Sequence, residues 1–230
     1  MAHEIQEHDS MASRELVPWH GLGDIFEGNI NTDEMLQRTG LDWPVILREM
    51  MVLPEEGDSW STCPMQGYRG TLRGDLNPPL PLGTVSDKYV PLQNRDIFQA
   101  FDPLIEQGLL EYETGGSLKN CRTVWVLARY TGNGGHVVEI DGDPIKQYML
   151  ITTNHTGAGA VEIKPTQVRV VCNNTLQASL NSGQSLRFQH VGNVADRVAE
   201  AARGVTEAGE HMCELQRIFR SMVSLQLNQE

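Results

Sequence analysis

The sequence predicts an α+β domain centred on an antiparallel sheet of about five strands with packed helices. Segments of alternating apolar residues lie between residues 84 and 153, with a helical pattern among them. A loop-rich N-terminal arm precedes this core, and a long C-terminal helix follows it. We therefore divide the chain into an arm over residues 1–82, a core domain over 83–190 and a helix over 191–230.

The N-terminal third is acidic and rich in turn-forming residues. Residues 1–82 hold five Lys or Arg against fourteen Asp or Glu. Thr32 is a good cap for a short helix that ends at Gly40, and residues 43–52 have the apolar content of a strand. Residues 54–83 are rich in Pro, Gly and acidic side chains, so we expect a long loop with one short hairpin there.

The central region alternates between strand and helix patterns. We expect strands over residues 84–92, 109–114, 121–130 and 145–153, and a helix from Asn94 or Asp96 to Gly108. Residues 115–120 contain turn-forming Gly, Ser and Asn, which predicts a hairpin between the second and third of these strands. Both alternating sets of strand 121–130 are apolar, so this strand should lie centrally with cover on both faces.

Residues 166–180 fit either a strand or a helix. The run from Val168 to Val171 is β-branched and favours a strand, whereas Thr166 is a good helix cap and apolar residues recur there at helical spacing. We prefer the helix. This run also holds Arg169, Asn173 and Asn174, whose polar groups need partners in an apolar setting, either backbone or a ligand. On a helix, Arg169 and Asn173 would lie one turn apart.

The C-terminal segment has the most regular apolar pattern of the chain. Apolar residues from Val191 to Met222 recur at alternating spacings of three and four, which predicts a helix about 50 Å long. The helix would pack either on its own sheet or, through a seam that includes Ala201 and Ala208, on another copy of the chain.

Composition restricts the class of protein. The net charge is −12, but residues 83–190 hold nine Lys or Arg against ten Asp or Glu, which allows a local basic surface. The four cysteines lack metal-ligand spacing and are expected to be reduced thiols. No signal peptide or membrane-spanning segment is recognisable. We expect a soluble cytoplasmic protein without membrane partners.

No catalytic motif is recognisable, so we expect no enzyme activity, cofactor or metal. Two polar segments are candidate sites. The hairpin residues Lys119, Arg122 and Arg129 would form either a phosphate-facing patch or an ordinary solvated hairpin. Residues 152–157, at the end of a strand, would form either a turn or a binding site.

Several sequence blocks resemble one known family. They are Pro18-Trp19-His20-Gly21-Leu22-Gly23, Val85-Ser86-Asp87-Lys88-Tyr89, Gln93-Asn94, Tyr112-Glu113-Thr114-Gly115-Gly116-Ser117-Leu118, Val124-Trp125, Thr153-Asn154-His155 and Arg169-Val170-Val171-Cys172-Asn173-Asn174-Thr175-Leu176. Together they are similar to the "phage/plasmid-like protein" family, an uncharacterised-domain family of phages, plasmids and prophages. The order of the expected elements also resembles the core of the single-strand annealing proteins of recombination.

The first resemblance implies a mobile-element protein and carries no assigned activity. The similarity in element order to the annealing proteins implies a non-enzymatic role in DNA metabolism, in which the protein binds or anneals single-stranded nucleic acid and self-assembles. The nucleic-acid-binding residues would be Lys119, Arg122, Arg129, Arg169, Asn173 and Asn174. Single-stranded DNA and further copies of the chain would be its partners. The alternative is a self-assembling or host-interaction protein that binds no nucleic acid.

Overall fold

The fold is mostly β. The computed structural model describes residues 5–15, 21, 23–56, 58–131, 138–140, 143–170, 173–181 and 185–192. A seven-stranded sheet has the order β12-β11-β10-β7-β6-β1-β2, a three-stranded sheet has the order β3-β4-β5, and β8 and β9 form a small hairpin. The seven-stranded sheet is mixed, because β1 pairs parallel with β2 and the other neighbours pair antiparallel.

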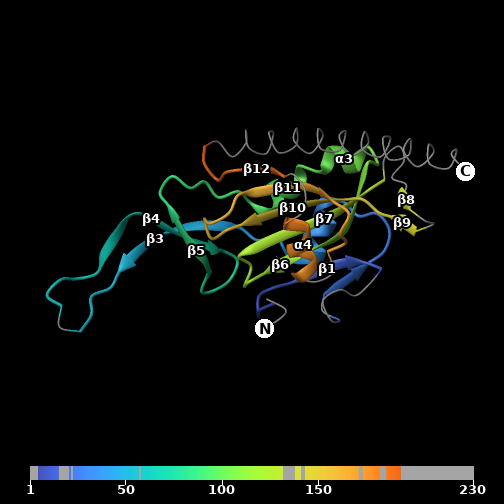
Figure 1. Ribbon diagram of the computed structural model, residues 1–230. Helices are drawn as coiled ribbons and strands as arrows, with labels where there is room; N and C mark the ends of the chain where they lie inside the picture. The colour runs from blue at the N-terminus through green and yellow to red at the C-terminus, as the bar shows by residue number, and fades with distance from the viewer. Residues whose placement is uncertain are drawn as a thin grey trace, which may run out of the picture.

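The strands of the seven-stranded sheet come from both ends of the described chain (Figure 1). They are β1 (Met11–Arg14), β2 (Asp24–Phe26), β6 (Leu110–Leu118), β7 (Thr123–Tyr130), β10 (Tyr148–Asn154), β11 (Val161–Thr166) and β12 (Leu186–Phe188). The three-stranded sheet is made by β3 (Val45–Val52), β4 (Cys63–Arg73) and β5 (Leu80–Ser86), and the small hairpin by β8 (Val138–Ile140) and β9 (Asp143–Ile145).

Four short helices accompany these strands in the described residues. They are α1 (Thr32–Thr39), α2 (Asn94–Gln99), α3 (Asp102–Glu106) and α4 (Asn173–Asn181). The side chain of Asn31 caps α1 by accepting from the amide of Glu34, and Gly40 ends it in the left-handed conformation. The predicted helix over 94–108 is interrupted: α2 ends at Gln99, and a separate helix α3 begins at Asp102, with Pro103, which has no amide hydrogen, in its first turn.

Strand β7 lies in the middle of the sheet with cover on both faces, as predicted. Val124, Val126 and Ala128 belong to the larger core, which includes the buried apolar residues of α1, α2 and α3. Trp125 and Leu127 face the opposite way and belong to a second core. That second core is completed by Val170 and by α4.

The predicted α+β fold with about five antiparallel strands is wrong, and so is the loop-rich N-terminal arm. Residues 45–86 form an antiparallel sheet, and β1 pairs with β6 inside the central sheet. Strand β3 agrees with the expected strand over residues 43–52, whereas β4 escapes prediction because it is exposed on both faces for most of its length and so does not alternate. The predicted C-terminal helix over 191–230 lies outside the described residues, apart from Val191 and Gly192.

The β6–β7 hairpin is confirmed, with a different turn. Gly115 and Gly116 continue strand β6 and do not turn the chain. A Cβ atom on Gly115 would lie 2.7 Å from Cε of Met35, and one on Gly116 would lie 2.7 Å from Cβ of Met11. Glycine is needed at both positions because β1 and α1 pack so closely on this strand.

Candidate functional site

Helix α4 covers only the middle of one face of the seven-stranded sheet. Beneath it lie Trp125, Leu127 and Leu150, which are buried. Directly opposed residues in a sheet point to the same face, so the register places Thr152 beside Trp125 and Glu162 beside Thr152 on this face. The face therefore continues beyond the C-terminal end of α4 as a polar surface.

A groove of about 490 Å³ lies on this polar surface. Strands β7, β10, β11 and β12 form its floor, and the C-terminal end of α4 forms a wall. Its polar lining includes Lys119, Thr123, Thr152, Asn154, Glu162, Lys164, Gln177 and Arg187. We call this hollow the polar groove.

Three cations and one carboxylate set the charge of the polar groove. Lys119 is exposed on the β6–β7 turn. The side chain of Arg187 is 64% exposed, although its guanidinium lies 2.6 Å from a carboxylate oxygen of Glu162. Lys164 is only 2% exposed and donates to the carbonyl oxygen of Leu180 over 2.7 Å. The balance of these four residues is positive, in a chain whose net charge is −12.

Burial lowers the pKa of the Lys164 ammonium group, and the nearby carboxylate of Glu162 partly offsets this effect. The hydrogen bond to Leu180 places the ammonium at the end of α4, where the helix dipole favours a positive charge. Lys164 therefore joins strand β11 to the helix while it lines the polar groove.

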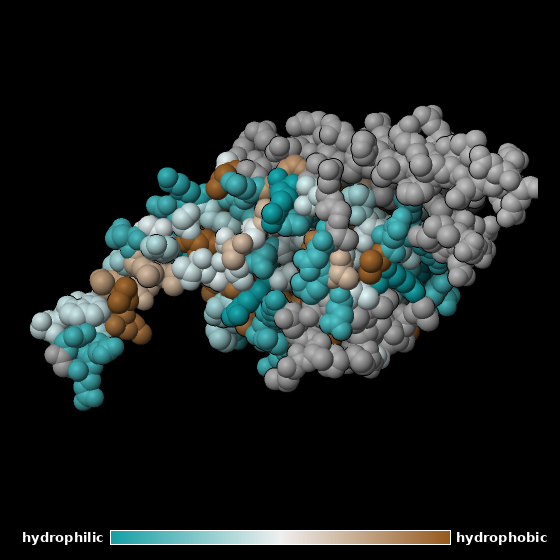
Figure 2. All heavy atoms as spheres, viewed as in Figure 1, coloured by the Kyte–Doolittle hydropathy of each residue, from teal (hydrophilic) through white to brown (hydrophobic). Residues whose placement is uncertain are grey.

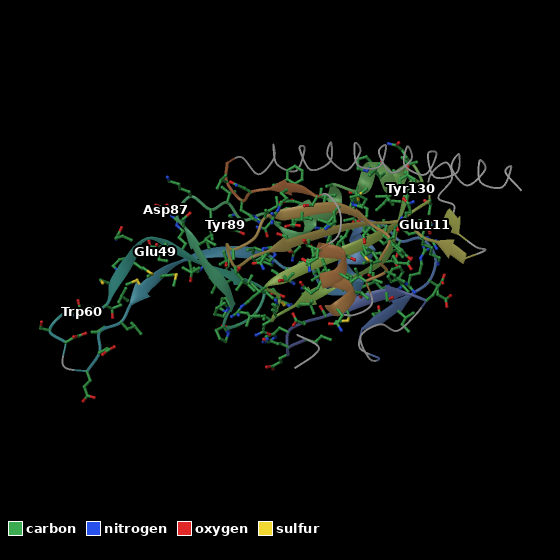
Figure 3. The ribbon with its side chains drawn as sticks, viewed as in Figure 1. Glu49, Trp60, Asp87, Tyr89, Glu111 and Tyr130 are labelled. Carbon is green, nitrogen blue, oxygen red and sulfur yellow. The ribbon has the colours of Figure 1, made fainter. Side chains whose placement is uncertain are left out.

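A second hollow, of about 630 Å³, continues from the polar groove toward the three-stranded sheet. The two hollows share Gly159, Ala160 and Arg187. Tyr68 of β4 lines this second hollow and is 51% exposed. Tyr89 stacks on His190 with ring centroids 4.9 Å apart, and Figure 3 shows it beside β5, where the two sheets meet. We call this region the aromatic hollow.

The turn that carries Lys119 has a strained backbone held by an acidic side chain. Lys119, Asn120 and Cys121 have consecutive φ values of 58°, 61° and 64°, in the left-handed region that favours glycine. The carboxylate of Asp9 accepts from the amide of Asn120 over 3.0 Å and from that of Cys121 over 2.7 Å. The N-terminal segment thus fixes the position of Lys119 at the edge of the polar groove.

The six predicted nucleic-acid-binding residues do not form one patch. Lys119 lines the polar groove, and Arg122 is exposed beside the same turn. Arg129 lies at the opposite end of β7, six residues beyond Thr123 and hence about 20 Å away. At that end it forms an ion pair with Glu111 over 2.8 Å.

Arg169 belongs to the same cluster of charged residues as Arg129 and Glu111. Its guanidinium is 2.8 Å from a carboxylate oxygen of Glu113, which is 2% exposed, and it donates to the carbonyl oxygen of Arg14 over 3.0 Å. Arg14 in turn forms an ion pair with Glu111 over 2.7 Å. Burial raises the pKa of Glu111, but hydrogen bonds from Arg129, Asn29 and Arg14 outweigh burial and lower it overall.

The preferred helix over 166–180 begins later than expected. Residues 167–170 are irregular and α4 starts at Asn173, so Arg169 and Asn173 do not lie one turn apart on a helix. Asn174 is exposed near the beginning of α4. Within the described residues, no group of acidic, His or Cys side chains has the arrangement of a metal site. The described helices also include none that is long and apolar enough to span a membrane.

One protein family matches this chain. The model of the family described as "Domain of unknown function (DUF932)" matches residues 81–230. The chain belongs to this family. No curated protein and no solved structure matches the chain. The DUF932 region contains all of the polar groove and most of the aromatic hollow, whereas Tyr68 and the protruding part of the three-stranded sheet precede it.

Lys164 and Arg187 are not among the predicted site residues, because β11 and β12 are not among the predicted strands. A signal for β11 is present: Val161 and Ile163 alternate with Glu162 and Lys164. Pro165 obscured this signal, since proline is rare inside a sheet. Strand β12 has three residues, too few for a periodic pattern.

Proposed function

We propose that this protein binds single-stranded nucleic acid along the polar groove and the adjoining aromatic hollow. The observation that carries the proposal is the continuity of a cation-lined groove with an aromatic-lined hollow, on an open sheet face of an otherwise acidic chain. Proteins that hold single strands combine these features: cations follow the backbone, and aromatic rings stack on bases.

The exposed cations Lys119 and Arg187 are the phosphate ligands in this proposal. Arg187 already pairs with Glu162 on the protein surface, and a phosphate would take over part of that interaction. Tyr68, which is half exposed, is the ring available for stacking. Thr123, Thr152 and Asn154 supply neutral hydrogen-bonding groups along the floor.

The biological role that we propose is that of a non-enzymatic, cytoplasmic protein of a phage or plasmid. The blocks that resemble the phage/plasmid-like protein family support this assignment, and the DUF932 match is consistent with an uncharacterised domain. In that role the protein would hold single strands in a form that a complementary strand can pair with, and copies of the chain would assemble along the strand.

The test measures binding of a fluorescent oligothymidine by anisotropy at about 50 and 200 mM salt. We expect measurable affinity at low salt and a steep decrease at high salt, because several phosphates are neutralised. The double variant Lys119→Ala, Arg187→Ala should bind more weakly, and its salt slope should be lower by about one for each phosphate that is no longer neutralised. Tyr68→Ala should weaken binding with an unchanged salt slope.

Lys146→Ala is the matched control for these variants. Lys146 is equally an exposed cation, but it precedes β10 at the end remote from Asn154, about 25 Å away. This variant should bind as the parent chain does. If the parent does not bind at low salt, or if Lys146→Ala weakens binding as much as the groove variant does, the proposal fails.

The second candidate is a self-assembling or host-interaction protein that binds no nucleic acid. Two observations favour it. Arg129 and Arg169 are occupied by Glu111 and Glu113, and a part of the three-stranded sheet exposes apolar side chains. Complete absence of oligonucleotide binding, together with a defined assembly, would select this candidate.

A further inference from the structure

Carboxylate groups are abundant on this protein, and they normally repel the phosphates of a nucleic acid. The chain holds 30 Asp or Glu against 18 Lys or Arg. Hydrophilic residues cover much of the described surface of the main body in Figure 2. The carboxylate of Asp9 has a different environment, because it is directed onto backbone amides beside the polar groove. These contacts distinguish it from a surface charge.

Four donors surround the carboxylate of Asp9. Its Oδ1 accepts from the amide of Cys121 over 2.7 Å and from the hydroxyl of Ser117 over 3.1 Å. Its Oδ2 accepts from the amide of Gln6 over 2.8 Å and from that of Asn120 over 3.0 Å. A carboxylate has about four lone-pair positions, so these contacts use its full capacity. Two of the donors are adjacent amides of the turn between β6 and β7.

The conformation of this turn depends on the carboxylate. Residues 119–121 all have positive φ, and none of them is glycine. A residue with a side chain is strained in this region and stays there only where surrounding contacts hold it. Successive amides in such a turn converge and form a concave site for an anion. Asp9 supplies that anion, so its carboxylate stabilises the left-handed conformation of the turn.

Asp9 is itself held in place by the central sheet. Strand β1 begins two residues later, and Met11 pairs with Gly116 of β6. The amide of Ser117 donates to the carbonyl oxygen of Ser10 over 2.9 Å, which brings the residue after Asp9 beside the end of β6. The carboxylate is therefore a fixed anchor for the turn and not a mobile charge.

The turn in its left-handed form sets the place of Lys119 in the polar groove. Lys119 is the first of the three strained residues, and it lines the groove. If the turn relaxed to negative φ, the direction of the chain at Lys119 would change and its ammonium group would leave this edge. A binding group that is held in position before the ligand arrives loses less freedom on binding. The anchored turn therefore favours the binding of a phosphate.

We infer that Asp9 is a positioning residue for nucleic-acid binding, which acts on Lys119 through the backbone of residues 119–121. The inference rests on the proposed function of the polar groove, and it adds a residue that precedes the DUF932 region of residues 81–230. Its expected effect has the opposite sign to that of simple electrostatics. Removal of a carboxylate near a phosphate site should strengthen binding through the Coulomb interaction, whereas removal of Asp9 should weaken it.

The test compares Asp9→Ala with Glu7→Ala by the anisotropy of oligothymidine at about 50 and 200 mM salt. Asp9→Ala should bind more weakly, and its salt slope should be lower by about one, as for Lys119→Ala. Glu7 is an exposed carboxylate in the same segment, so Glu7→Ala removes the same charge and should bind at least as tightly as the parent. Asp9→Asn keeps one acceptor oxygen and should give an intermediate loss.

Two further measurements separate positioning from a general loss of structure. In a double-mutant cycle, Asp9→Ala should cause no further loss in the Lys119→Ala background, because Asp9 acts through Lys119. Amide hydrogen exchange of Asn120 and Cys121, measured without nucleic acid, should be faster in Asp9→Ala than in the parent, while the amides of β7 keep their rates. If Asp9→Ala does not fold, Asp9→Asn takes its place in both measurements.

The outcomes distinguish this inference from the proposed function. A parent chain that does not bind oligothymidine contradicts the proposed function, and the inference fails with it. A parent that binds, together with Asp9→Ala that binds equally well or more tightly, overturns the inference alone. Additive losses in the cycle also overturn it, as do amides of Asn120 and Cys121 that exchange in the parent as fast as unprotected amides.

Discussion

The ammonium nitrogen of Lys164 lies 2.7 Å from the carbonyl oxygen of Leu180, which connects β11 to the last turn of α4. The carbonyl oxygens in the last turn of a helix have no partner within the helix. Lys164 supplies one, and it does so from beneath the helix at the wall of the polar groove. The placement of α4, and hence the size of the groove, depends on this side chain.

Lys164→Met should lower both the stability and the oligonucleotide affinity of the protein. Methionine fills a similar volume but leaves the Leu180 carbonyl without its donor, so we expect a loss of about 1 to 3 kcal/mol in the free energy of unfolding. Urea unfolding and anisotropy measure the two effects. Arg187→Ala is the comparison, because Arg187 is largely exposed and should change affinity with little change in stability.

Arg169→Ala should destabilise the protein without weakening nucleic-acid binding. The substitution leaves the buried carboxylate of Glu113 without its cation, which costs about 3 to 5 kcal/mol for a buried pair. Thermal unfolding measures the loss. The groove lies at the other end of the sheet, so the folded variant at low temperature should bind oligothymidine as the parent does.

The double variant Arg169→Met, Glu113→Gln removes both charges of this pair and serves as the control. It should recover most of the stability that Arg169→Ala loses, because no uncompensated charge remains buried. Lost affinity in the stable double variant would return Arg169 to the binding site and contradict its assignment as a structural residue.

Gly83→Ala should be strongly destabilising because it forces the two sheets apart. A Cβ atom at position 83 would lie 2.3 Å from Cα of Thr156, in the turn that follows β10. We expect a loss of about 1 to 3 kcal/mol, measured by urea unfolding. Gly70→Ala, on the neighbouring strand, is the control: its Cβ would meet no atom closer than 3.7 Å.

The sequence predicts the centre of the fold better than its edges. The two apolar faces of strand 123–130, with Trp125 on one side and Val126 on the other, correctly place β7 in the middle of the sheet. A strand that is buried on both faces can be recognised from its own residues, because both alternating sets are apolar. The exposed outer part of the β3–β4 pair has no such pattern. Met51 and Val52 are adjacent, apolar and both exposed, so alternation is absent.

The candidate site is predictable only in part, for a similar reason. Lys119 is identifiable from its own hairpin, but the groove that it lines also needs Lys164 and Arg187 from β11 and β12. Strands β11 and β12 lie near β7 only because the sheet has the order β12-β11-β10-β7. Whether Arg129 faces a ligand or Glu111 depends on cross-strand register, which local sequence patterns do not contain.

The imidazole of His155 should make stability depend on pH below neutrality. His155 is fully buried and shares a hydrogen bond of 2.9 Å between its Nε2 and Oδ1 of Asn94. Its ring lies at 70° to the ring of Trp43, with centroids 5.5 Å apart. Burial, with a smaller effect of nearby His190, lowers the pKa of His155 from 6.5 to about 3. In the unfolded chain the imidazole takes up a proton near pH 6.5, whereas in the folded protein it stays neutral down to about pH 3.

The unfolded state therefore binds more protons between these two values, so the free energy of unfolding decreases as the pH falls through this window. The contribution of His155 to the free energy of unfolding is complete above pH 6.5. Below this pH it decreases with a limiting slope of about 1.4 kcal/mol per pH unit. His155→Gln keeps a donor for Asn94 but cannot take up the proton. Urea midpoints at pH 8 and pH 5 should differ less for this variant than for the parent, even though the variant is less stable at pH 8. Acidic side chains contribute equally to both proteins and cancel in the comparison. Parallel pH dependences would therefore show that folding does not lower the pKa of His155, and would contradict the prediction.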